Sequence, residues 1–202
     1  MAARFLFSQN METTVIKIKK AKLCKGGCIE ATYTDTDGNE IIIKGKNRCH
    51  TDLKVAFAVL VPYFTDLTEQ KEADRIDWSN LDSAENVELL RKIDVTGISI
   101  GGDSNNRIIT VTGNRTLQST RVLNLNAPGV EVDSESFDWE YVEDFDIAVE
   151  NLLYEVKEYI VNRKWDLSQK EMNFDDNPDD PFAQAEATDS VASVEVHIES
   201  VA

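Results

Sequence analysis

The chain has 202 residues, of which 42% are hydrophobic, and a formal net charge of −16. This length and composition are typical of one globular domain and short for two. No run of about 18 apolar residues occurs, the apolar patch Phe5 to Phe7 is too short for a secretory signal, and there are only three cysteines. A membrane span and a secreted disulfide scaffold are therefore not expected, and we predict a soluble, cytoplasmic protein.

The charge is distributed unevenly along the chain. Residues 1–130 hold 17 Lys and Arg against 16 Asp and Glu, whereas residues 171–202 hold nine acidic residues and no basic one. Residues 15–54 are locally basic, with nine Lys and Arg against five acidic residues. This asymmetry predicts separate roles for the two ends of the chain.

The first elements expected are three antiparallel strands, at 15–23, 29–33 and 40–45. In the first strand, lysines alternate with apolar residues, and the Lys19–Lys20 doublet breaks the alternation in the way that a β-bulge would. Gly26-Gly27 and Asp37-Gly38 supply the two hairpin turns. Asp35 to Asn39 partly matches a calcium loop, but Lys44 stands at its closing position, so a hairpin turn suffices.

The elements that follow indicate an α+β class. A helix capped by Thr51 or Asp52 carries apolar residues at helical spacing and should stop or kink at Pro62. Residues 65–82 are irregular, with Trp78 as an anchor onto the body. Further helices are expected at 83–92, capped by Asp82 or Ser83, and at 142–163, and further strands at 93–100, 107–113 and 121–126. The order βββ-α-α-βββ-α predicts a mainly antiparallel sheet packed by helices.

The sequence shows no internal repeat and divides into three parts. Residues 1–12 are expected to form a flexible N-terminal extension, and residues 13–167 a single α+β domain. Residues 168–202 are expected to be a disordered acidic tail, because their high charge and few large apolar groups cannot offset the entropy cost of ordering.

The tail contains a motif in which acidic residues precede Pro-Phe. It resembles the acidic tip of bacterial and phage single-stranded DNA-binding proteins, and that resemblance implies docking on a replication or repair protein. Unlike the family's terminal Phe, the Phe here is followed by twenty more residues. A purely solubilising tail is the alternative. The candidate partner-binding residues are Phe174, Asp175, Asp176, Asp179, Asp180, Pro181 and Phe182.

The body offers basic residues on the predicted strands. Proteins that bind single strands combine a cationic surface with aromatic faces on which bases stack. The alternative is an ordinary sheet with a solvated lysine face. The candidate nucleic-acid-binding residues are Lys17, Lys19, Lys20, Lys22, Tyr33, Lys44, Lys46, Arg48, Arg107, Arg115 and Arg121.

The cysteines raise the question of a metal site. Cys24, Cys28, Cys49 and His50 match the ligand count of zinc, but adjacent residues such as Cys49 and His50 point in opposite directions on a strand. We therefore predict no metal and no cofactor. Cys24 and Cys28 flank the Gly26-Gly27 turn, and if that turn is tight they would face each other and could form a disulfide on oxidation.

The motifs of the commoner enzyme classes are absent from the sequence, and His50 is the sole histidine of the expected domain. We predict a non-enzymatic, single-stranded DNA-binding or DNA replication and recombination accessory protein. The body looks like small accessory proteins of bacteriophages and mobile elements, in segments 50–53, 96–102 and 123–128, which implies a host cytoplasmic location. The alternatives are an acidic adaptor or inhibitor that mimics nucleic acid through residues 131–182, and a structural phage protein. Self-association stays open.

Overall fold

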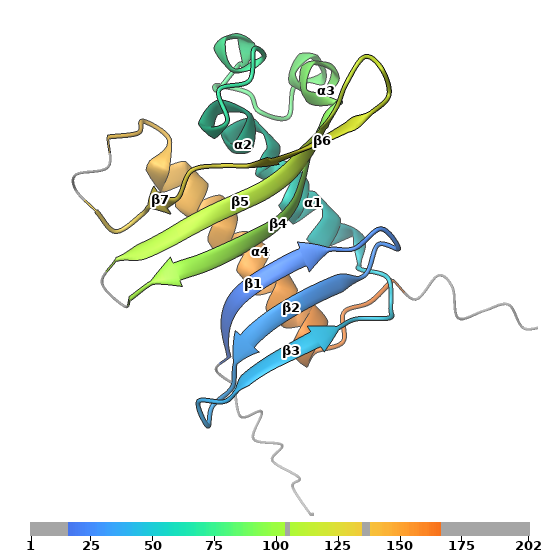
Figure 1. The fold of residues 1–202 in the computed structure, drawn as a ribbon, viewed down its shortest axis with the longest axis vertical. Coiled ribbons are helices and arrows are strands. Elements are labelled where there is room, and N and C mark those ends of the chain that lie inside the picture. The colour runs from blue at the N-terminus through green and yellow to red at the C-terminus, as the bar shows by residue number, and fades with distance from the viewer. Residues whose placement is uncertain (1–15, 104–105, 135–137, 167–202) are drawn as a thin grey trace, which may run out of the picture. The chain divides into compact units, whose positions relative to one another are not determined.

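The computed structural model describes residues 16–103, 106–134 and 138–166. These residues form an α+β fold in which helices pack on an antiparallel sheet (Figure 1), as the element order predicts. The six expected strands are present, and a short seventh, β7, was not predicted. The strands are β1 (Lys17–Leu23), β2 (Ile29–Thr34), β3 (Glu40–Lys44), β4 (Ile93–Gly102), β5 (Arg107–Thr116), β6 (Val122–Asn126) and β7 (Val130–Glu131).

The sheet joins two three-stranded meanders through their first strands. The order is β3-β2-β1-β4-β5-β6, with every neighbouring pair antiparallel, and β7 pairs with the far end of β5. Each meander is followed by a helix, so the topology repeats about a two-fold axis between β1 and β4. The sequence shows no internal repeat, so the correspondence between the two halves is one of topology.

The bulge predicted at the lysine doublet is present, and it has a counterpart in the second meander. The β1–β2 register shifts between Ile18 and Lys20, and the β4–β5 register shifts between Val95 and Gly97. Ala21 pairs with Ile98 at the centre of the β1–β4 contact, so each bulge lies two residues before the central position of its strand. The topological repeat therefore extends to the local irregularities of the backbone.

The helices begin and end close to the predicted positions. They are α1 (Thr51–Val59), α2 (Val61–Leu67), the short 3₁₀ turn η1 (Ala73–Arg75), α3 (Ala84–Leu90) and α4 (Val142–Val161). Pro62 lies in the first turn of α2, where its missing N–H costs no hydrogen bond, so the predicted break falls at Leu60. Ser83 caps α3 as expected, whereas His50, rather than Thr51 or Asp52, caps α1 by accepting from the Asp52 N–H.

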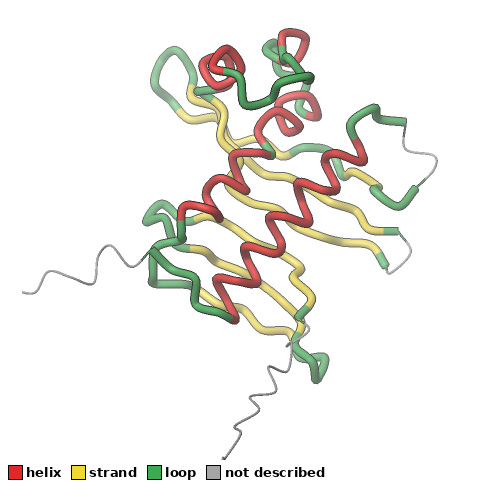
Figure 2. Tube along the Cα trace, turned by 180° about the vertical axis from the view of Figure 1, so that it is seen from behind, coloured by secondary structure: helices red, strands yellow, loops and turns green. Residues whose placement is uncertain are grey.

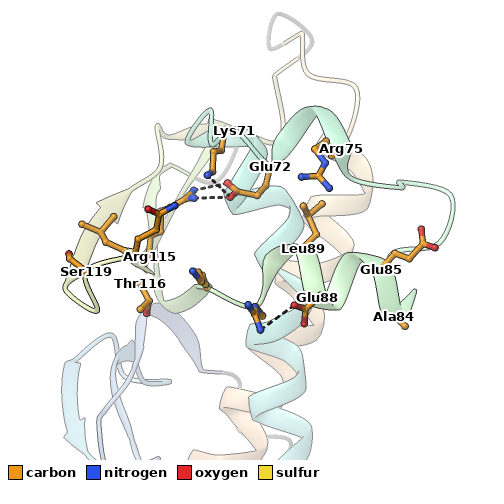
Figure 3. A pocket seen from close by; sticks show the side chains of 14 residues that line it. Lys71, Glu72, Arg75, Ala84, Glu85, Glu88, Leu89, Arg115, Thr116 and Ser119 are labelled. Carbon is orange, nitrogen blue, oxygen red and sulfur yellow. Dashed lines mark hydrogen bonds and ion pairs between the residues drawn. The ribbon is translucent and has the colours of Figure 1, made fainter.

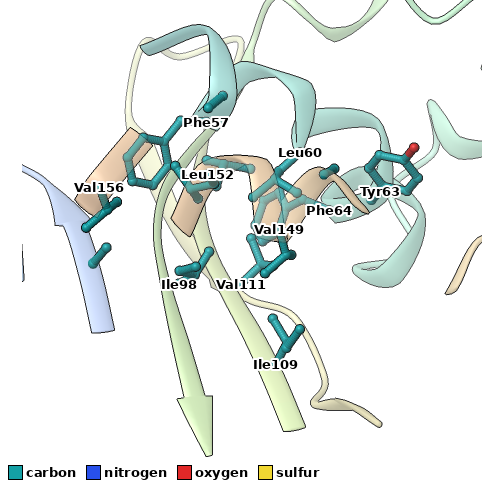
Figure 4. Close-up of a cluster of buried hydrophobic side chains, with 14 of the residues drawn as sticks. Phe57, Leu60, Tyr63, Phe64, Ile98, Ile109, Val111, Val149, Leu152 and Val156 are labelled. Carbon is teal, nitrogen blue, oxygen red and sulfur yellow. The ribbon is translucent and has the colours of Figure 1, made fainter. Parts of the chain in front are cut away.

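One hydrophobic core lies between the sheet and the helices. Figure 2 shows α1 and α4 crossing one face of the sheet, with α4 running diagonally over the strands. The inward-facing residues of α4 are buried and contact the apolar side chains of α1, α2, β4 and β5 (Figure 4). This burial supplies the main stabilisation of the fold. The fully buried side chains include Leu53, Phe57, Leu60, Phe64, Ile98, Ile109, Val111, Phe145, Val149 and Leu152.

Aromatic rings attach the segment between α2 and α3 to the start of α4. Trp78, which was expected to anchor the irregular segment, stacks on Tyr141 at a ring-centroid distance of 3.7 Å. Trp139 meets Tyr63 edge-on and donates its indole N–H to Asp66 over 2.8 Å.

Within the part of the chain that the structure describes, no helix is long and apolar enough to cross a bilayer.

Candidate nucleic-acid interface

One face of the sheet carries no helix within the described residues. Figures 1 and 2 show the two faces in turn, with α1 and α4 on only one of them. Because side chains alternate between the faces of a strand, every second residue of each strand belongs to this uncovered face. The paired registers and the exposure of these residues identify them, and they are mainly lysine, threonine, serine, asparagine and glycine, with three acidic residues, Glu30, Glu40 and Asp94, among them.

The lysines of β1 form a ridge along the middle of the uncovered face. Lys17, Lys20 and Lys22 alternate with the buried Ile18 and Ala21, and all three are exposed. The bulge places Lys19 on the same side, because a bulge gives two successive residues the same orientation. The four lysines proposed from β1 are thus brought together.

The ridge is only partly neutralised. Lys19 forms an ion pair with Glu40 of β3, and Lys44 lies 4.0 Å from Glu30 of β2. The side chains of Lys17, Lys20 and Lys22 make no ion pair or hydrogen bond with any described residue. Glu30 is the cross-strand neighbour of Lys22, but exposed ammonium groups without an ion-pair partner on a shared surface attract anions.

Beside the lysine ridge lies a strip of small residues, which sequence reasoning missed. On β4 the uncovered positions include Thr96, Gly97, Ser99 and Gly101, because the bulge gives Thr96 and Gly97 the same orientation, and Lys22 and Lys20 pair with Gly97 and Ser99. Threonines flank this strip on the other side, where Thr112 and Thr110 of β5 pair with Gly97 and Ser99. Gly97 is buried and its carbonyl accepts a hydrogen bond from the Thr112 hydroxyl, so the part of the strip that is open beside the free lysines consists of partly exposed Ser99 and exposed Gly101. Thr110, Thr112 and Asn114 alternate with Ile109, Val111 and Gly113, and that alternation was the signal available in the sequence.

Tyr33 does not lie on the uncovered face. It pairs with Ile18 across the β1–β2 ladder and packs against the core between sheet and helices. The described strand residues of the uncovered face include no Phe, Tyr or Trp. The face can therefore contact phosphates, but it offers no aromatic platform for base stacking.

Arg107 also lies on the helix-covered side, where it is surrounded by carboxylates. Its Nε lies 3.1 Å from Asp133, and its two terminal nitrogens contact Asp146 and Glu150 of α4. Hydrogen bonds from Arg107 lower the pKa of Asp133, and the same carboxylates raise the pKa of the guanidinium further. Arg107 therefore joins α4 to the start of β5, and its charge is already paired with carboxylates.

Arg115 lines a cleft between the β5–β6 hairpin and α3, with a volume of about 1060 Å³ (Figure 3). It forms a two-pronged ion pair with Glu72, and its Nη1 also donates to Gln70 over 2.9 Å. Arg91 at the cleft's other side is paired with Glu88. The structure thus places Arg115 away from the lysine ridge and satisfies its charge internally.

The remaining predicted residues lie at the margins. Lys46 and Arg48 are exposed in the connection between β3 and α1, and Arg121 is exposed just before β6. The proposed partner-binding residues, Phe174 to Phe182, lie outside the described residues, as do the N-terminal extension and the whole tail.

The outer side of α4 has the opposite charge. Glu143, Asp144 and Glu150 are exposed on this helix, beside exposed Ile147 and Tyr154. The described domain therefore has a lysine ridge on one face and an acidic helix on the other.

Within residues 16–103, 106–134 and 138–166, no group of three or more His, Cys, Asp or Glu side chains is arranged to hold a metal ion. His50 instead contacts Asp52 at 3.2 Å.

Comparison with family models, curated proteins and solved structures yields no match to this chain.

Proposed function

We propose that this protein binds nucleic acid, single-stranded DNA first among the candidates, through phosphate contacts on the uncovered sheet face. It would act without catalysis, as a replication or recombination accessory protein. The observation that carries the proposal is that Lys17, Lys20 and Lys22, three exposed lysines without an ion pair among the described residues, lie together beside the small-residue strip of β4.

The arrangement supports contact with the sugar–phosphate backbone in particular. Lysines neutralise phosphates, and serine and threonine hydroxyls donate to phosphate oxygens without reading base identity. With Tyr33 turned into the core, stacking contributes little on this face. We therefore expect binding that is independent of base sequence and steeply dependent on salt.

A salt titration tests the proposal through the slope of affinity against salt. Fluorescence anisotropy of a labelled oligothymidylate is followed between about 50 and about 200 mM salt. Lys17, Lys20 and Lys22 are changed together to Gln, which removes three charges without adding repulsion. If each lysine neutralises one phosphate, the magnitude of the log–log slope should fall by about 2, since a single strand contributes roughly 0.7 per contact.

The matched control changes Lys54, Lys71 and Arg75 to Gln. These three basic residues lie off the uncovered face, on α1, before η1 and in η1. The control should keep the wild-type slope. Equal losses in the two triple variants would contradict the proposal, as would the absence of wild-type binding at low salt even after removal of residues 168–202. A labelled duplex of the same length measures the preference for single strands.

The tail would recruit a partner protein. A Phe beside carboxylates suits a short motif whose ring enters an apolar pocket while the charges guide approach. Burial of a Phe ring stabilises a complex by roughly 1.5–3 kcal/mol, so Phe182→Ala should weaken capture of replication proteins about ten- to hundredfold. Truncation directly after Phe182 should maintain or improve capture. If both variants capture replication proteins as wild type does, the tail is a solvated acidic segment without a docking motif.

A second candidate function is supported by the acidic outer side of α4. Carboxylates around exposed Ile147 and Tyr154 suit a basic protein surface, as in an adaptor or inhibitor that mimics nucleic acid. The two candidates differ in one measurement. If the lysine ridge is the functional face, Tyr154→Ala should leave oligonucleotide affinity unchanged. If the outer side of α4 is the functional face, the same change should abolish capture of a basic partner protein.

A further inference from the structure

The three cysteines meet at one end of the β1–β2 hairpin. Cys24 and Cys28 flank its turn, and the Cys49 N–H, from the segment before α1, donates to the Gly27 carbonyl over 2.7 Å. Cys24 and Cys28 are partly exposed, whereas Cys49 is fully buried. All three are free thiols.

The turn itself places Cys24 opposite Cys28. The Cys24 N–H donates to the Cys28 carbonyl over 2.8 Å, and the Gly27 N–H donates to the Cys24 carbonyl over 2.9 Å. Gly27 has a φ of 73°, a left-handed conformation that closes a three-residue hairpin loop with a bulge. Leu23 and Ile29 are the last paired residues of the β1–β2 ladder, and Cys24 and Cys28 follow them directly on the two strands. Opposed positions of an antiparallel ladder have Cα atoms about 4.5–5.5 Å apart, within the roughly 4.4–6.8 Å range that a disulfide spans.

The side chains agree with this backbone geometry. Burial raises the pKa of the Cys24 thiol, and the neighbouring Cys28, which is close enough for a thiol–thiol hydrogen bond, raises it further. Burial also raises the pKa of Cys49 to about 11. Thiol–disulfide exchange needs a thiolate that is accessible to solvent. Cys49 has almost no thiolate at neutral pH and is buried, so it should not take part.

We propose that Cys24 and Cys28 form a redox-active dithiol that a small disulfide such as oxidised glutathione converts into an intrachain disulfide, leaving Cys49 as a thiol. The thiolate of one cysteine attacks the glutathione disulfide, which forms a mixed disulfide and releases one glutathione thiolate. The second cysteine, after losing its proton, attacks the mixed disulfide and releases the second glutathione. The protein loses two electrons and two protons, and the two glutathione molecules take them up.

The reaction joins two cysteines that the formed hairpin turn already holds close together. It would close a covalent ring at the end of β1, two residues beyond Lys22. The proposal is independent of nucleic-acid binding, and its test uses no nucleic acid.

The test treats the full chain with oxidised glutathione at mildly alkaline pH, blocks free thiols with iodoacetamide, and maps the products by mass spectrometry. Wild type should contain one disulfide between Cys24 and Cys28 and one alkylated residue, Cys49. Cys24→Ser and Cys28→Ser should each stop at the mixed disulfide with glutathione on the remaining partner. Cys49→Ser should form the same disulfide as wild type. If the buried position of Cys49 does not tolerate serine and this variant fails to fold, Cys24→Ser and Cys28→Ser test the proposal.

Three outcomes would overturn the proposal: alkylation of all three cysteines after oxidation, a disulfide that includes Cys49, or a stable glutathione adduct on wild type.

Discussion

Arg115 and Glu72 form a two-pronged ion pair whose side chains are each only 13% exposed, with nitrogen–oxygen distances of 2.6 and 2.7 Å. The pair joins β5 to the segment between α2 and α3, which are distant in sequence. The guanidinium, chiefly through its hydrogen bonds, holds the pKa of Glu72 below the ordinary value of 4.5. Removal of the Glu72 carboxylate would leave the Arg115 guanidinium largely buried without its ion-pair partner, which lowers the stability of the fold.

Glu72→Gln should therefore lower the free energy of unfolding at pH 7 by about 1.5–3 kcal/mol. Because the folded-state pKa is lowered, the wild-type advantage is fully present above about pH 4.5 and is lost as the pH falls through the lowered pKa. Urea unfolding at several pH values measures this. Glu88→Gln is the control, since its ion pair with Arg91 is exposed and should contribute less than about 1 kcal/mol. Equal effects of the two variants at pH 7 would contradict the prediction.

Gly113 should tolerate no side chain. A Cβ atom there would lie 2.4 Å from the Asp94 carbonyl oxygen and 2.7 Å from the Phe64 ring, so the core residue and the strand would both have to move. We expect Gly113→Ala to lower the free energy of unfolding by at least about 2 kcal/mol. Gly101→Ala, whose nearest contact would be 3.9 Å away, should be neutral or slightly stabilising. Chemical denaturation of both variants compares them, and similar midpoints would count against the packing described.

Ser99→Leu should obstruct the small-residue strip without changing any charge. If a nucleic-acid backbone crosses β4 beside Lys20, the added side chain should weaken oligonucleotide binding about tenfold, roughly 1.4 kcal/mol, and leave the salt slope intact. Thr36→Leu, at the exposed β2–β3 turn, is the control. Unchanged affinity of Ser99→Leu would mean that the bound strand takes another path over the lysines.

Removal of residues 171–202 should strengthen nucleic-acid binding at low salt. This segment holds nine acidic residues and no basic one, so we expect it to compete with phosphates for the lysine ridge. The gain should fade as salt rises, because screening weakens the competition over the Debye length. Anisotropy titrations of both forms across the salt series measure the effect. A gain that is constant across salt would indicate a cause other than charge.

The local elements could be predicted from the sequence because their signals are local. Alternation of lysine with apolar residues marked β1, the Lys19–Lys20 doublet marked its bulge, and helical spacing marked α4. The two-residue β7 carried too little pattern to be recognised, and the His50 cap depended on a side-chain geometry that the residue type does not specify.

Which face each strand residue occupies relative to the helices was decided only by the tertiary structure. Alternation shows that Tyr33 shares a side with Ala31, and Arg107 with Ile109, but it does not show which side becomes covered. That choice depends on where α1 and α4 pack, and α4 lies more than a hundred residues after β1. Burying the larger apolar area took Tyr33, Arg107 and Arg115 to the helix side, where carboxylates from distant segments neutralise the two arginines. The β1 lysines stayed on the uncovered side because an unpaired ammonium group keeps its free energy of hydration only in water.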